Sequence, residues 1–555
     1  MKPILLASIF ILLCSCGGGG SSDETGSPSS VPPVVQTPTT EELQAASKLL
    51  NVATFGPTFD EIYNAAVDGR DAWLDTQFTA PMSAHMPIVE RYIDEYGFDF
   101  SSDPLPGVYR RYAFWERALA APDQLRQLSA YALSQIFVVS DNVDAFLVDP
   151  RALATYYDLL LTHAFGNFRD LLLAVTLNPS MGFYLSHVNN AKTNESANTF
   201  PDENYAREVM QLFSIGLFEL NQDGSRKRDI DGEPIPTYDN TTIREFSRIF
   251  TGLGYSPEQG GAPVSFGEDR RNFHTPMQMF EDFHEGGDKV LLNGTVVPDG
   301  QTGMQDIEAA IDNLFQHPNV GPFIGKQLIQ RLATSNPSSA YVGRVAAAFE
   351  GDDETPRGDM KAVLRAILTD PEAESGIRLR EPFRRYVALN RSIGVTSDDA
   401  TLPGLGFIAQ YLLEQHVLSA PSVFNFYQPD HIPAGEVGDL GLLGPEFQIT
   451  NASTLAGMTN LYAFALYGDR SIDTLDGFTT IRLELDDFSS LADDTNALLD
   501  RIDLVFFSGE MHEELRSILE GTIAIYQQAA LSSTDIARVA LYLALSSPDY
   551  AIQGT

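Results

Sequence analysis

Both cysteines of the chain lie within its first sixteen residues, at positions 14 and 16. The rest of the chain therefore has no disulfide, no cysteine nucleophile and no cysteine-ligated zinc or iron–sulfur cluster. A fold built by the remainder of these 555 residues must be stable through its hydrophobic core alone.

The N-terminus is similar to a bacterial lipoprotein leader. Lys2 precedes an apolar run from Ile4 to Leu13, which is too short for a transmembrane helix of about 20 apolar residues. The run ends in the sequence LCSCG at 13–17, which resembles a lipobox. We expect cleavage after Ser15 and acylation of Cys16, for example by palmitate. The alternatives are an ordinary signal peptide, or cleavage that leaves the earlier cysteine first.

Residues 17–40 are rich in Gly, Ser, Pro and Thr and contain few apolar side chains. Such a segment buries too little apolar surface to fold, and it behaves as a flexible tether. We therefore divide the chain into a signal peptide at 1–15, a lipidated cysteine with its tether at 16–41, and a folded domain at 42–555. Gly17, where an Asp would favour the inner membrane, predicts an outer-membrane lipoprotein, on the periplasmic face or at the cell surface.

The charge of the chain is strongly acidic, with 75 Asp and Glu against 36 Lys and Arg, a net charge of −39. This balance argues against nucleic-acid binding and against polybasic attachment to anionic lipid, because both need a basic surface. Solubility in a salty medium explains the charge most simply, and binding of divalent cations is the alternative.

Apolar residues recur at helical spacing along most of the domain. The pattern predicts a mainly α fold, a large multi-helix globular body with a few β-hairpins. Two Asp-Gly turns, at 223–224 and 231–232, predict the hairpins. The length of the domain also allows two closely packed subdomains, divided near residue 300. The predicted helices include 107–140, 150–176, 203–215, 240–251, 304–317, 320–334, 338–350, 358–369, 380–394, 404–418, 448–466, 494–504, 510–528 and 533–545.

The helix predicted at 203–215 separates polar from apolar residues completely. Its polar face carries Glu203, Asn204, Arg207 and Glu208, with Glu203 and Arg207 at the i, i+4 spacing of an ion pair. Two carboxylates beside a guanidinium are able to supply a general acid, a general base and an anion clamp, or oxygen ligands for a metal. A solvated surface is the simpler interpretation. The sequence has no HExxH, GxSxG, Walker A or Rossmann motif.

This segment and GNFRDLLLAVTLNP at 166–179 resemble the core motif of a large bacterial family, catalogued as domain of unknown function 1800. Collinear matches extend the resemblance over nearly the whole domain. The resemblance implies an exported protein but gives no reaction. Genes of the family often neighbour those of a second exported, sulfatase-like family, so a protein of that kind is a candidate partner. The further matching segments are ATFGPT at 53–58, FSRIFTGLGY at 246–255, FHEGGDKVLL at 283–292, HPNVGPFIGKQLIQRL at 317–332, REPFRR at 380–385 and PSVFNFYQPD at 421–430.

The chain departs from the family pattern at two places. Many members have Trp-His-Asn-His where this chain has Leu133-Ser134-Gln135-Ile136, and His-Asp where it has His284-Glu285. The remaining candidates are Glu203, Arg207, Glu208 and His284 as catalytic residues, with Asn204 and Lys289 as binding residues. Three acidic residues near His284 would suit calcium or magnesium, and they are Glu281, Asp282 and Glu285.

Two functions remain open. The first, which the missing histidines and the absence of a catalytic signature favour, is a lipid-anchored envelope protein that binds a partner or assists assembly. The alternative is an envelope hydrolase that uses the Glu/Arg/His site, with or without a divalent cation.

Overall fold

The computed structural model describes residues 37–97, 106–398, 402, 406–468, 470–474 and 477–554. From Pro38 onward the chain forms one compact unit. The expected signal peptide, Cys16 and nearly all of the expected tether lie outside the described residues, so the lipid anchor stays a prediction. The first described helix begins at Thr40, and Thr39 caps it by accepting a hydrogen bond from the backbone N–H of Glu42.

Helices dominate the described part of the chain, and its strands form sheets of two or three short strands. The predicted fold class, mainly α with a few hairpins, is confirmed. The helix predicted at 107–140 is divided in two, because Pro122 disfavours helical conformation at the preceding residue. The first helices are α1 (Thr40–Ala53), α2 (Phe59–Asp68), α3 (Arg70–Thr79), α4 (Met86–Tyr96), α5 (Tyr109–Ala120), α6 (Gln124–Ser134), α7 (Asp144–Val148), α8 (Pro150–His163), α9 (Phe168–Leu177) and α10 (Pro179–Tyr184).

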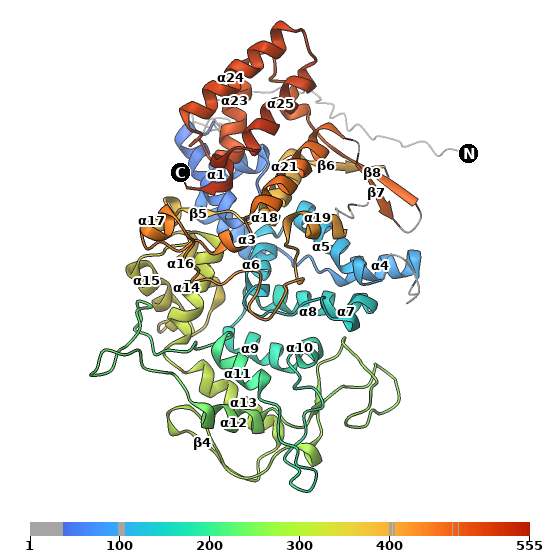
Figure 1. Cartoon of the computed structure of the whole chain (residues 1–555), viewed down its shortest axis with the longest axis vertical. Helices are drawn as coiled ribbons and strands as arrows, with labels where there is room; N and C mark the ends of the chain where they lie inside the picture. The colour runs from blue at the N-terminus through green and yellow to red at the C-terminus, as the bar shows by residue number, and fades with distance from the viewer. Residues whose placement is uncertain are drawn as a thin grey trace, which may run out of the picture. The chain divides into compact units, whose positions relative to one another are not determined.

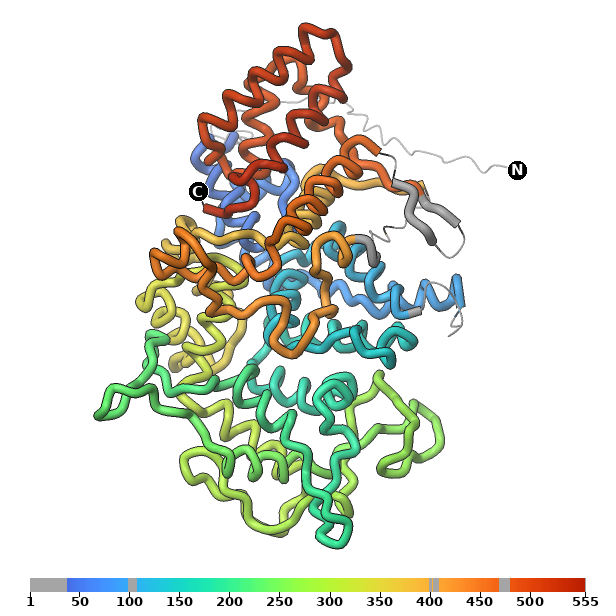
Figure 2. Tube along the Cα trace, in the orientation of Figure 1, coloured from blue at the N-terminus to red at the C-terminus, as the bar shows by residue number. Residues whose placement is uncertain are grey.

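The central segment holds two more helices and most of the turns. Between α11 (Asn204–Gln211) and α12 (Asn240–Ile249) the chain makes the two predicted hairpin turns, where Gly224 and Gly232 have positive φ of 76° and 85°. Figure 2 shows this green segment extending away from the helices. Two antiparallel pairs follow, β1 (Leu253–Gly254) with β2 (Gln278–Met279) and β3 (Lys289–Val290) with β4 (Val296–Val297).

The remaining helices run to the end of the described chain. They are α13 (Gly303–Phe315), α14 (Val320–Leu332), α15 (Ser339–Glu350), α16 (Met360–Leu368), α17 (Pro371–Glu374), α18 (Pro382–Ile393), α19 (Gly406–Leu413), α20 (Glu436–Asp439), α21 (Ala452–Tyr467), α22 (Asp486–Ser489), α23 (Thr495–Ile502), α24 (Glu513–Gln528), α25 (Ser533–Leu545) and α26 (Pro548–Ala551). The strands among them are β5 (Arg378–Leu379), β6 (Val395–Ser397), β7 (Arg470–Thr474), β8 (Gly477–Leu483) and β9 (Ile552–Gln553). In the three-stranded sheet, β8 lies between β6 and β7.

One large apolar core joins these elements, and its buried side chains run from Ala46 in α1 to Tyr550 in α26. Helices α14, α15 and α16 pack against one another, and α23 to α25 lie at the opposite end of the unit from α11 to α13 (Figure 1). A smaller cluster of buried residues joins α4 to α5 and α8. Within the described ranges, no helix combines the length and the hydropathy that a membrane crossing requires.

Candidate functional site

The polar face of α11 forms the ion pair that its spacing predicts. Arg207 Nη2 lies 3.3 Å from Glu203 Oε2, and both side chains are 41% exposed. Asn204 and Glu208 form no hydrogen bond with each other in the described residues. A half-exposed ion pair of this kind contributes about 0–1 kcal/mol, so Glu203 and Arg207 are open to solvent and to ligands rather than fixed in place.

Glu208 differs from its neighbours because its side chain is buried. Its Oε2 atom has no hydrogen-bond partner in the described part of the chain, and neither does the hydroxyl of Tyr238. Burial raises the pKa of Glu208, while the charge of Arg207 opposes the rise. Burial and the nearby charge of Glu208 raise the pKa of Tyr238 to about 12. Glu208 therefore holds its proton more readily than a solvated glutamate does.

His284 and Lys289 meet at a third residue that the sequence did not indicate. His284 Nε2 lies 3.0 Å and Lys289 Nζ 2.7 Å from the same oxygen of Asp306. The other ring nitrogen of His284 lies 2.9 Å from the carbonyl of Thr251. All three side chains are buried, so this cluster is a closed polar network in which each member already has a partner.

The loop around His284 is held against α12. Arg248 donates hydrogen bonds to the carbonyls of Gly286 at 2.7 Å and Asp288 at 2.9 Å. Glu285 Oε2 accepts a hydrogen bond from the backbone N–H of Thr193. The contacts close the long connection between β1 and α13. In the described residues, no hydrogen bond or ion pair joins this cluster to Glu208 on α11.

The acidic residues near His284 do not converge on a point. Glu281 Oε2 accepts a hydrogen bond from the backbone N–H of Gly303, and Glu285 is engaged by Thr193. Among the residues that the structure describes, no group of three or more His, Cys, Asp or Glu is arranged to hold a metal ion.

A cavity of about 370 Å³ lies elsewhere, between α14 and the segment 423–430. One face of α14 lines it with residues at the spacing i, i+3, i+4, i+7 and i+8. The opposite wall is the segment 423–430, which runs back toward α14 as the orange chain after α19 (Figures 1 and 2). The face of α14 consists of Phe323, Lys326, Gln327, Gln330 and Arg331, and the other lining residues are Gln135, Ile136, Gln211, Leu212, Gly216, Leu217, Phe218, Leu220, Gly224, Arg226, Pro322, Val423, Phe424, Asn425, Gln428, Pro429 and Asp430.

The carboxamide of Gln135 forms the floor of this cavity and is held in place by hydrogen bonds. Gln135 donates from Nε2 to Glu381 at 3.3 Å, and its Oε1 accepts from Asn425 at 3.2 Å and lies 3.0 Å from the hydroxyl of Tyr427. Gln330 ties the two walls together by donating to the carbonyl of Pro429 at 2.9 Å. Gln135 occupies a position where the family resemblance places the Trp-His-Asn-His run, and here it supports the cavity through hydrogen bonds.

Glu381 anchors the floor from below and is fully buried. It accepts hydrogen bonds from Tyr131 at 2.5 Å, Tyr427 at 2.7 Å and Gln415 at 2.9 Å. Burial alone would raise the pKa of Glu381, but the charges of Arg378 and Arg384 and the tyrosine hydroxyls hold the pKa below its usual value. A buried carboxylate with this many donors is a rigid support, because removing any one donor leaves part of the charge without a partner.

Arg378 links Glu381 to a second buried carboxylate. Its Nη2 lies 3.3 Å from Glu381 Oε1 and 3.2 Å from Glu446 Oε1. Burial raises the pKa of Glu446 to about 7, although the charge of Arg378 opposes the rise. Tyr427 within the lining segment and Glu446 further along the chain are thus both tied to the buried pair of Glu381 and Arg378.

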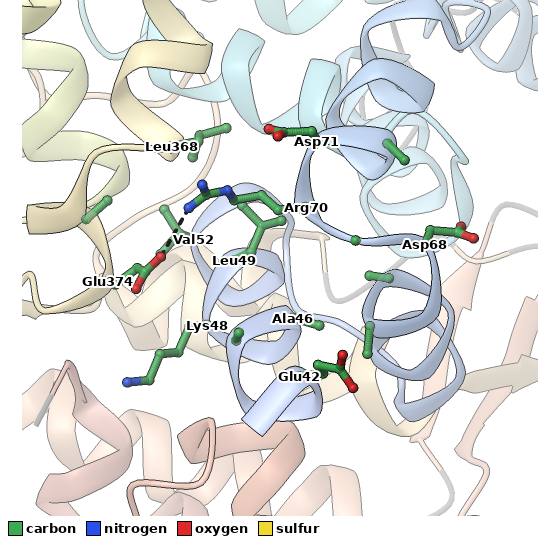
Figure 3. Close-up of a pocket in the computed structure, with 16 residues that line it drawn as sticks. Glu42, Ala46, Lys48, Leu49, Val52, Asp68, Arg70, Asp71, Leu368 and Glu374 are labelled. Carbon is green, nitrogen blue, oxygen red and sulfur yellow. Dashed lines mark hydrogen bonds and ion pairs between the residues drawn. The ribbon is translucent and has the colours of Figure 1, made fainter. Parts of the chain in front are cut away.

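A second, larger cavity of about 650 Å³ lies among α1, α2, α3 and α16–α17 (Figure 3). Alanines form much of its wall, and its charged groups are engaged. Arg70 reaches across it to Glu374 at 3.2 Å, and Lys48 pairs with Glu510 at 2.5 Å. This cavity offers a ligand few free polar groups, so the cavity on α14 is the stronger candidate.

Sequence reasoning missed the residues of the α14 cavity. They come from four segments, 135–136, 211–226, 322–331 and 423–430. The last two lie within the family motifs at 317–332 and 421–430, which the sequence shows as family matches and not as a site. A signal was present, since Lys326 is a lone lysine within the apolar run FIGKQLIQRL.

The arrangement defines a helical protein with separate buried ion clusters and a cavity whose lining mixes apolar and polar side chains. The chain belongs to the family described as Protein of unknown function (DUF1800), which matches it over residues 48–552. Searches of curated proteins and of solved structures found no match.

Proposed function

We propose that the protein is a lipid-anchored binding protein of the bacterial cell envelope, and that its ligand occupies the cavity on α14. The leader, the lipobox-like sequence ending at Cys16 and the tether support the anchor. An outer-membrane location, on either face, follows from Gly17. A sulfatase-like exported protein is the partner protein that the family resemblance suggests.

The cavity carries the binding part of the proposal. It is concave, mixes apolar walls with a few polar groups and rests on a support of buried hydrogen bonds, as sites for small ligands commonly do. Catalysis is less favoured, because His284 and Lys289 already bind Asp306.

Hydrolysis remains a second candidate because of one observation. The buried, unpartnered oxygen of Glu208 and its raised pKa suit a general acid. The test is Glu208→Gln, which keeps the shape of the side chain. If the protein is such a hydrolase, Glu208→Gln should stay folded but no longer release product. If it is a binding protein, the same variant should still bind its ligand.

The anchor is tested by metabolic labelling with radioactive palmitate in a bacterial host. Label in the wild type and in Cys14→Ser, with none in Cys16→Ser, is the expected result. Equal labelling of all three chains, or of none, would contradict the anchor.

Binding in the cavity is tested by native mass spectrometry of the protein extracted from bacterial envelopes. Gln428 lines the cavity, and Gln428→Trp is expected to fill it and to release a bound species. Gln528→Trp, at the exposed end of α24, is the matched control and should retain that species. The proposal would be contradicted if the wild type carried no bound species, or if Gln428→Trp retained the species that the wild type binds.

A further inference from the structure

Two polar groups of the α14 cavity lack hydrogen-bond partners, and this bears on the kind of ligand that the cavity binds. Among the residues that line the cavity, Gln327 and Arg331 each have one buried side-chain nitrogen without a hydrogen-bond partner in the described residues, Gln327 Nε2 and Arg331 Nε. Both atoms are donors, and an unpartnered buried donor costs free energy that an acceptor would relieve.

The cations of the cavity point the same way. Lys326 is partly buried on α14 and forms no ion pair in the described residues, and Arg226 lies on the rim with its guanidinium 4.6 Å from the ring centroid of Phe218. Burial lowers the pKa of Lys326, the charge of Asp430 raises it, and the charge of Arg226 lowers it further. Two cations therefore act on each other across the cavity, and Asp430 is the nearby opposing charge.

This arrangement is unusual in so acidic a chain. The net charge of the protein is −39, yet the lining of this cavity has three cations, Arg226, Lys326 and Arg331, against the one carboxylate of Asp430. Glu381 and Glu446 lie near the charge of the buried Arg331, so Lys326 and Arg226 are the cations left for a ligand. Keeping like charges together in a partly buried site costs free energy unless an anion joins them.

The apolar part of the lining sets the second requirement. The rings of Phe218, Phe323 and Phe424 share the cavity with the cations, and Phe424 is 47% exposed. Aromatic side chains bind flat apolar or aromatic groups, while lysine and arginine bind carboxylate or phosphate oxygens.

We propose that the ligand of this cavity is a small molecule or chain end with an anionic head group, carboxylate or phosphate, joined to an apolar body. Lys326 and Arg226 bind the head group, Gln327 Nε2 donates to it, and the phenylalanine rings pack on the body. This inference rests on the proposed ligand-binding function and names the class of ligand.

The test uses the full-length chain in a detergent without a sugar head group, and measures dissociation constants by ligand-observed NMR at fixed ionic strength. Phenyl phosphate and benzoate represent the two anionic heads, and benzyl alcohol and maltotriose are neutral probes. We expect one or both anions to bind more tightly than the neutral probes, and the tighter of the two identifies the head group.

The variant Lys326→Gln is expected to weaken the anion about tenfold or more, because it removes a charge-assisted hydrogen bond. Arg226→Gln should weaken it less, since Arg226 is exposed. Lys361→Gln, an exposed lysine of α16, is the matched control and should leave binding unchanged. Gln428→Trp should abolish binding and Gln528→Trp should not.

The outcomes separate the inference from the function beneath it. Neutral probes that bind as well as the anions, are blocked by Gln428→Trp and ignore Lys326→Gln would overturn the anionic ligand and leave a binding cavity. Anion binding that neither Lys326→Gln nor Gln428→Trp reduces would place the anion elsewhere and overturn the inference. Absence of binding by all four probes would count against both.

Discussion

Tyr427 donates a hydrogen bond of 2.7 Å to the fully buried carboxylate of Glu381, from a segment 46 residues further along the chain. This bond joins the wall of the α14 cavity to the support below it. Loss of this bond is therefore expected to lower the stability of the protein.

Tyr427→Phe removes one donor from a buried carboxylate. We expect the free energy of unfolding to fall by about 1.5–3 kcal/mol, the usual contribution of a hydrogen bond to a charged group. Denaturant unfolding measures it. Tyr462→Phe is the matched control, because the buried hydroxyl of Tyr462 has no partner in the described residues and its loss should cost little. Equal effects of the two changes would show that the bond to Glu381 contributes nothing.

Asp306→Asn is expected to destabilise the protein by about 3–5 kcal/mol, because it leaves Lys289 charged and buried without its counterion. The comparison is Asp312→Asn on the same helix, whose ion pair with Arg169 is largely exposed and should contribute at most about 1 kcal/mol. Thermal and denaturant unfolding of both variants measure the difference. A small effect of Asp306→Asn would mean that the cluster around His284 is not structural and would reopen it as a site.

The raised pKa of Glu446 predicts a dependence of stability on pH. Its pKa lies near 7 in the folded protein against an ordinary value of 4.5, so between these values the folded state holds a proton that the unfolded chain has lost. The contribution of Glu446 to the free energy of unfolding therefore falls as pH rises from about 4.5 to 7. The fall corresponds to a rise in the unfolding constant of up to about tenfold per pH unit.

Glu446→Gln removes this titration. The unfolding free energy of the variant, relative to the wild type, should be higher at pH 8 than at pH 5, and denaturant unfolding at several pH values measures it. Glu436→Gln, at the exposed start of α20, is the matched control. A difference between Glu446→Gln and the wild type that stays constant over this range would contradict the burial of a titrating carboxyl.

Gly216→Ala tests the turn that closes α11. Gly216 has a φ of 72°, and a Cβ there would lie 2.7 Å from the ring of Phe323. We expect a loss of more than the roughly 1 kcal/mol that positive φ alone costs an alanine. Gly232→Ala, with a φ of 85° and nothing within 4 Å of its Cβ position, isolates that backbone cost. Similar losses in the two variants would show that Phe323 moves aside freely.

Local features of the fold were predictable from sequence, and distant ones were not. The helices followed the spacing of their apolar residues, and the ion pair of Glu203 with Arg207 followed from their positions one turn apart. Gly216 directly follows the helix predicted at 203–215 and has the left-handed conformation that commonly ends a helix. Asp306 as the partner of His284 and Lys289 was not predictable, because it depends on how the connection at 252–303 closes against α13.

The α14 cavity was hidden for the same physical reason. Gln135, Arg226, Lys326 and Gln428 lie far apart in sequence, and only the packing of their elements brings them together. Each residue alone reads as an ordinary surface or helix position. A lone lysine in an apolar helix is the one local sign that such a position faces an enclosed space.

The two ends of the described domain are built into its middle. Ser47 of α1 donates a hydrogen bond to the carbonyl of Leu504, and β9 at Ile552–Gln553 pairs with β5 at Arg378–Leu379. During synthesis, the partners of α1 and β5 emerge last from the ribosome. Although α1 can pack on α2 at once, its packing is therefore complete only when nearly the whole chain has been made.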